Sequence, residues 1–145
     1  MRELLAHAAR LGVSVHVAHL PEPYNGFYDH ENQRVIYDFK LAPIERDCVL
    51  AHELAHVYLG HHDRGDETAE AAADAYAAAL LIDPERYAQL ETIGLNPEEV
   101  AEELGVTVKL LRAFVENHLT RVRGAAYTQS RMGAGQFRHA ARWAT

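Results

Sequence analysis

The segment His52-Glu53-Leu54-Ala55-His56 has the residue types and the spacing of a metal-dependent hydrolytic site. In a helix, residues four apart share one face, so the imidazoles of His52 and His56 can reach one metal ion. Glu53 then lies about 100° round the helix from His52, where its carboxylate can contact a metal-bound water without binding the metal. Such a site holds zinc through three protein ligands and leaves the fourth position for water. The motif therefore predicts zinc (Zn2+) chemistry with Glu53 as the general base.

The elements that must position this motif are two consecutive helices. Pro43 is expected in the first turn of a helix that carries the motif and ends near Gly60. A second helix is expected from about Asp66 to Asp83, with Asp66 as its N-cap. The short polar loop 61–65 makes the two helices antiparallel neighbours.

This arrangement predicts a third ligand on the second helix. Glu70 lies four residues after the start of that helix, and His56 lies four residues before the end of the first, so the two are level, about 6 Å from the turn. Asp74 lies one turn deeper, level with His52. We therefore expect Glu70 to complete the metal site. Asp74 is expected to accept a hydrogen bond from the other ring nitrogen of His52. The many alanines around both acids favour a close approach of the two helices.

Other residues compete for the third position. His62 follows His56 by six residues, as the third histidine of a metzincin does, but Leu59 stands where that motif requires glycine and Gly60 comes one residue late. Asp63 and Asp66 are weaker alternatives. Cys48 lies one turn before His52 and is expected to be a buried core thiol rather than a ligand.

The remaining patterns predict an α+β fold that is mostly helical, with a small antiparallel β-sheet packed near the motif helix. Apolar spacing and turn residues indicate a helix over 2–11, a strand over 13–18, a hairpin near 27–29 and 34–39, a helix over 84–93 and a helix–turn–helix-like pair over 97–118. We assign a metallopeptidase domain to residues 1–119 and a basic C-terminal tail to residues 120–145.

Composition excludes several classes of protein. With 48% hydrophobic and 24% charged residues in a chain of 145, the sequence is globular rather than disordered. A single cysteine excludes an internal disulfide and a cysteine-based zinc cluster. The apolar runs fall far short of the roughly 20 residues that cross a bilayer. Arg10 and two histidines interrupt the N-terminal segment before a signal sequence could form. We expect a cytoplasmic protein with no membrane partner.

Charge is distributed unevenly along the chain. Residues 1–104 hold 7 basic and 20 acidic side chains, whereas residues 105–145 hold 7 basic and 1 acidic. An acidic body with an arginine-rich tail is compatible with a solvated extension, with docking of an acidic protein surface or with contacts to nucleic acid. Lys109 and Arg112 would lie on the exposed side of the second helix of the 97–118 pair. For that pair we favour packing on the peptidase core over binding of nucleic acid.

The combined motifs resemble the ImmA/IrrE family of zinc metallopeptidases. The resemblance is carried by HELAHVYLGHH and ETAEAAADAYAAALLIDP, by the preceding segment GFYDHENQRVIYDF and by the later VAEELGVTVKLLRAF, over roughly residues 12–118. It implies a site with His52, His56 and Glu70 as ligands and Glu53 as base. Family members resemble intracellular regulators that cleave helix–turn–helix repressors of phages, mobile elements or stress regulons. Compared with the family pattern, the gap between His56 and Glu70 is short, and one residue is added before Pro84.

We therefore interpret the chain as a zinc-dependent endopeptidase whose partner is a protein substrate, with a helix–turn–helix repressor as the implied class. The alternative is a DNA-binding regulatory or protein-interaction module with a structural or vestigial zinc site. The donor that would stabilise the oxyanion stays open among Tyr28, Tyr58 and His61. An exposed edge of the hairpin is expected to hold an extended peptide by strand addition.

Overall fold

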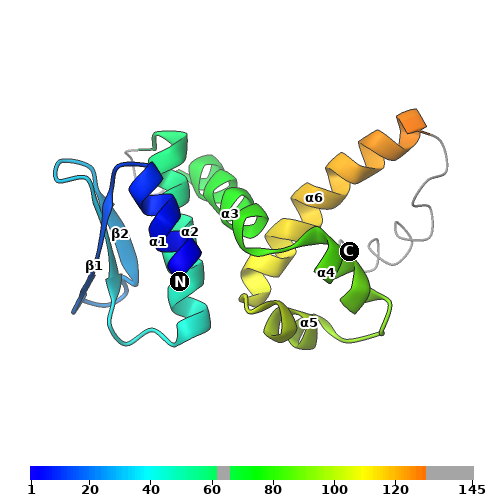
Figure 1. Cartoon of the computed structure of the whole chain (residues 1–145), viewed down its shortest axis with the longest axis horizontal. Coiled ribbons are helices and arrows are strands. Elements are labelled where there is room, and N and C mark those ends of the chain that lie inside the picture. The colour runs from blue at the N-terminus through cyan, green and yellow to red at the C-terminus, as the bar shows by residue number, and fades with distance from the viewer. Residues whose placement is uncertain (62–65, 130–145) are drawn as a thin grey trace.

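The computed structural model describes residues 1–61 and 66–129, with side chains described up to residue 118. Within these residues the chain is mostly helical and carries one small sheet, so the predicted α+β class is confirmed (Figure 1). The elements are α1 (Arg2–Arg10), β1 (Ser14–Ala18), β2 (Gly26–Asp29), β3 (Arg34–Asp38), α2 (Pro43–Leu59), α3 (Glu67–Leu81), α4 (Pro84–Glu91), α5 (Pro97–Leu104) and α6 (Val108–Gln129).

The sheet has the strand order β1-β3-β2. The predicted hairpin is confirmed, because β2 and β3 pair antiparallel with Tyr28 opposite Val35. The prediction of an antiparallel sheet is wrong for the remaining pair, because β1 runs parallel to β3 with Val15 opposite Val35. The reason lies in the connection that follows β1. The chain enters β2 at the end of the sheet where β1 finishes, and the hairpin then inserts β3 between them. A strand antiparallel to β2 must then run parallel to β1.

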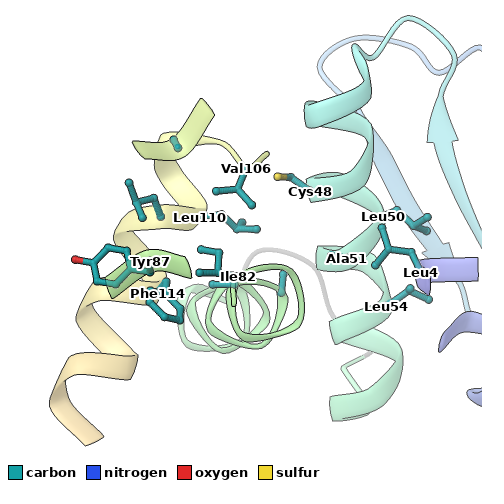
Figure 2. Packing of buried hydrophobic residues seen from close by; sticks show 14 of the residues in the cluster. Leu4, Cys48, Leu50, Ala51, Leu54, Ile82, Tyr87, Val106, Leu110 and Phe114 are labelled. Carbon is teal, nitrogen blue, oxygen red and sulfur yellow. The ribbon is translucent and has the colours of Figure 1, made fainter. Parts of the chain in front are cut away.

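Helix α2 stands between the two halves of the hydrophobic core. Figure 2 shows Leu50 and Leu54 on the side of α2 that faces Leu4 of α1, and Cys48 on the side that faces Val106 and Leu110. All of these side chains are buried. Burial on both sides fixes the rotation of α2 about its own axis, and with it the direction in which the two motif histidines point.

Helices α2 and α3 pack against each other more extensively than any other pair of elements. The reason is visible in the sequence, because Ala51 and Ala55 of α2 and Ala73 and Ala77 of α3 are all completely buried. Alanine adds only a methyl group between two helix backbones, so the axes can approach closely. Asp66 caps α3 as predicted, since its carboxylate accepts hydrogen bonds from the backbone N–H groups of Thr68 and Ala69.

The C-terminal helices cover the other side of α3. Asn96 caps α5, and Gly105 in the left-handed conformation (φ 72°, ψ 34°) turns the chain into α6. Helix α6 packs on α3, and Figure 1 shows its second half extending past α3. The structure therefore contains the expected helical pair. Its second helix runs to Gln129, past the boundary that we placed at residue 119.

The predicted tail is described only as far as the end of α6, and residues 130–145 lie outside the described residues. Among the helices that are described, none combines the length and the apolar character needed to cross a membrane.

A close approach between β2 and α2 gives a first prediction. A Cβ at Gly26 would lie 2.6 Å from Cγ1 of Val49 and 3.1 Å from the carbonyl oxygen of Ile36. Gly26→Ala should therefore lower the free energy of unfolding by about 1–3 kcal/mol through overpacking. The loss should be smaller in a Val49→Ala background, where the nearer clash is removed. Denaturant unfolding of the four variants of this cycle measures both values, and equal losses in the two backgrounds would show that Val49 is not the cause.

Candidate metal centre

Three side chains from α2 and α3 converge on one point. His52 Nε2 lies 2.8 Å from Glu70 Oε2, His56 Nε2 lies 3.2 Å from Glu70 Oε1, and the two Nε2 atoms are 3.1 Å apart. Nitrogen and oxygen ligands held at zinc–ligand lengths in a tetrahedron lie about 3.3 Å from one another. The spacing thus fits a single ion. Among the side chains described, within residues 1–61 and 66–118, this is the group whose ligand atoms gather closely enough to hold a metal.

Asp74 is the hydrogen-bond partner of the other ring nitrogen of His52. His52 Nδ1 donates a hydrogen bond of 2.8 Å to Asp74 Oδ1, which leaves the Nε2 lone pair for a ligand. The second carboxylate oxygen of Asp74 lies 3.7 Å from Lys109 Nζ of α6. Asp74 thus contacts His52, whereas Glu70 contacts both His56 and His52 and lies slightly closer to His52.

The electrostatics around these histidines favour a cation. Burial lowers the pKa of His52, but the hydrogen bond to Asp74 and the charges of Glu53, Asp74 and Glu70 oppose this, and the pKa of His52 ends above its ordinary value. Burial lowers the pKa of His56, and the neighbouring His52 lowers it further. Burial raises the pKa of Asp74, but its contact with His52 outweighs this, so the pKa of Asp74 is held below its usual range. The surroundings thus stabilise one positive charge near His52.

Glu53 lies next to the cluster and beside the sheet. It follows His52 in α2, and a Cβ at Gly26 would be 3.5 Å from Glu53 Cγ. Strand β2 therefore passes directly by the base side of the motif.

His61 contacts His56 on the side of the imidazole ring that faces away from Glu70. The two Nδ1 atoms are 3.1 Å apart, and the rings meet edge to face with centroids separated by 5.3 Å. From the sequence His61 was considered only as an oxyanion donor or a rim residue. This contact could have been predicted from Gly60, which ends the helix directly before His61.

The competing ligands are placed as follows. Asp66 uses its carboxylate to cap α3. Cys48 points toward Val106 (Figure 2) and is not part of the His52, His56 and Glu70 group. His62 and Asp63 lie outside the described residues.

The other two candidates for an oxyanion donor, Tyr58 and Tyr28, have contacts with residues outside the cluster. Tyr58 stacks on Tyr76 with ring centroids 4.8 Å apart, and two residues beyond His56 is roughly 200° round a helix. The hydroxyl of Tyr28 lies 3.4 Å from His30 Nδ1. The oxyanion donor thus stays open.

The comparisons with known proteins agree with this geometry. The profile of the Peptidase_M78 family, described as the IrrE N-terminal-like domain, matches residues 8–116. No curated protein matches the sequence at a significant level.

Among solved structures, a Mycobacterium tuberculosis transcriptional regulator is similar, with a TM-score of 0.60 and 20% sequence identity. The similarity covers 79% of this chain and 40% of that chain, so this chain spans less than half the length of the regulator. At this level of identity the likeness concerns the fold.

The burial of Cys48 gives a second prediction. Removal of the thiol from water raises its pKa, and hydrogen bonds from Thr107 only partly oppose this. The thiolate is the reactive form, so Cys48 should react with a disulfide reagent at least about tenfold more slowly in the folded protein than in the unfolded one. Because the chain has one cysteine, the colour released by the reagent reports this side chain alone. Equally fast labelling of both states would show that Cys48 is accessible.

Proposed function

The chain belongs to the Peptidase_M78 family of IrrE N-terminal-like domains, and from this membership together with the geometry of the site we propose that it is a zinc-dependent endopeptidase acting on a protein substrate. The observation that carries the proposal is the convergence of His52, His56 and Glu70 on one point, with their ligand atoms within 4.8 Å of one another. Two imidazoles and one carboxylate are a ligand set of hydrolytic zinc sites, which keep a fourth position open.

In this proposal each residue has a distinct task. His52, His56 and Glu70 would hold the ion, and Asp74 orients His52 through its Nδ1–H. A bound zinc supplies Lewis acidity, which polarises a carbonyl group and lowers the pKa of water toward 7. Glu53 accepts the proton of the attacking water and delivers it to the leaving amine. The same carboxylate thus acts first as base and then as acid.

The proposed binding mode of the substrate is an added strand. In the described part of the sheet β3 lies between β1 and β2, so β2 forms an edge. The face of β2 that packs on α2 lies near Glu53, since a Cβ at Gly26 would be 3.5 Å from Glu53 Cγ. An extended peptide that pairs with β2 would gain main-chain hydrogen bonds, and this pairing would bring a backbone carbonyl toward the metal position while Glu53 acts on the attacking water. Strand addition recognises backbone, so side-chain specificity would come from the surfaces around the edge.

For the substrate class we propose a helix–turn–helix repressor. The support is the resemblance of the motifs to regulators that cleave such repressors. A gene for a helix–turn–helix protein beside the gene for this chain would supply the first substrate to test, and cleavage of that purified repressor would be the direct readout.

The DNA-binding alternative has less support. The helical pair α5–α6 buries its apolar side in the core, with Val106, Leu110 and Phe114 all at most 3% exposed. Lys109 Nζ lies 3.7 Å from Asp74 Oδ2, although its side chain remains largely exposed. These contacts support packing of the pair on the peptidase core as its role.

The ligand set gives a third prediction. The protein should hold about one zinc per chain, and Glu70→Ala should abolish tight binding because it removes one of three ligands. Asp74→Ala should lower the affinity less, on the order of 10–100-fold, because Asp74 acts through His52. Glu67→Ala is the matched control, since Glu67 is an exposed acid one turn earlier on the same helix. Metal analysis after dialysis, with chelator competition, measures all three. Full zinc content in Glu70→Ala would contradict the ligand assignment.

The base gives a fourth prediction. Glu53→Gln keeps the size and the hydrogen-bonding capacity of the side chain but cannot accept a proton from water. The variant should keep its zinc and its thermal unfolding midpoint while cleavage of the substrate falls at least about 100-fold. Cleavage is followed by gel electrophoresis beside the metal content of the same sample. An unchanged rate would remove Glu53 from the mechanism.

A further inference from the structure

The second ring nitrogen of His56 has a partner from beyond the end of its own helix. His56 Nδ1 lies 3.1 Å from His61 Nδ1, while His56 Nε2 faces His52 and Glu70 at 3.1 and 3.2 Å. The ring of His56 is thus held between the metal-binding atoms on one side and His61 on the other. His56 itself is buried and His61 is partly buried, so the contact is partly shielded from water.

The backbone explains why His61 is found there. Gly60 adopts the left-handed conformation (φ 72°, ψ 28°), and the N–H of His61 donates to the carbonyl of His56 at 3.0 Å. This bond, which spans five residues, is the signature of the Schellman motif that ends many helices. It turns the chain back so that residue 61 lies over residue 56. A Cβ at Gly60 would meet nothing within 4 Å, so the requirement for glycine there is conformational rather than steric.

The chemistry of two facing imidazoles allows one arrangement when His56 is a ligand. A nitrogen that binds metal must offer its lone pair, so the proton of neutral His56 sits on Nδ1. His61 Nδ1 must then be the acceptor, and the proton of His61 sits on its Nε2. Such an acceptor fixes the tautomer and the ring orientation of a ligand.

We propose that His61 is a positioning residue, which orients His56 toward the metal as Asp74 orients His52. The inference rests on the proposed metal site. His61 is neutral in this role, which suits a site where Asp74, Glu70 and Glu53 already place negative charge around His52. Each histidine of the motif thereby has its own acceptor, a carboxylate from α3 in one case and an imidazole from the C-terminal turn of α2 in the other.

The test compares zinc affinity in three variants of the full chain. His61→Ala removes the acceptor and should weaken zinc binding on the order of 10–100-fold, measured by competition with a chromophoric chelator. His61→Gln restores a carbonyl acceptor and should recover part of the affinity. His16→Ala is the matched control, because His16 is an exposed histidine whose contact is with Ser14 on the sheet, and its affinity should equal that of the unaltered protein.

A spectroscopic readout separates positioning from loss of folding. Cobalt placed in the zinc site gives visible bands that respond to ligand geometry, and His61→Ala should change these bands while the metal-free protein unfolds at an unchanged temperature. An unaltered protein that binds no zinc would overturn the proposed function itself. An unaltered protein that binds zinc, together with a His61→Ala variant of equal affinity and equal cobalt spectrum, would overturn only the role of His61.

Discussion

The close contact between α2 and α3 is the constraint on which the site depends. Four completely buried alanines, Ala51 and Ala55 on one helix and Ala73 and Ala77 on the other, let the two backbones approach. Across this contact the short carboxylate of Asp74 reaches a ring nitrogen of His52 at 2.8 Å. A larger side chain at these positions would open the gap and break both carboxylate contacts together. The site is therefore as much a product of small residues as of the histidines and acids.

The same contact sets the electrostatic character of the site. It brings the carboxylates of Glu70 and Asp74 against two imidazoles that are largely buried, so negative charge gathers beside His52. The pKa of His52 is raised because its protonated, positively charged form offsets part of this negative charge. A bound cation relieves the same excess. The arrangement thus favours a metal by charge and by ligand geometry at once, and neither argument depends on the other.

Helical periodicity made most of this site predictable. Counting residues from the turn placed Glu70 level with His56 and Asp74 level with His52, and the structure has both contacts. The hairpin was also predictable from local pattern. The parallel pairing of β1 was not predictable in this way. It depends on whether β2 or β3 of the hairpin lies next to β1, and no local pattern encodes that choice. His61 was missed because the prediction stopped at the end of the helix, although Gly60 specifies the geometry of the residue after it.

The position of the helix end also decides between the two ways in which a third ligand can arrive. In the metzincin pattern a glycine soon after the second histidine ends the helix, so that a histidine on the returning chain can reach the metal. Here α2 continues to Leu59, and the left-handed residue is Gly60. The first residue of the returning chain, His61, is thereby directed to His56 Nδ1, on the side of the ring away from the metal-binding nitrogen. Among the described residues, α3 presents Glu70 to the Nε2 atoms of both histidines, at 2.8 Å from His52 and 3.2 Å from His56. The left-handed residue at position 60 thus leads His61 to His56 Nδ1, while Glu70 of α3 faces the Nε2 atoms of both motif histidines.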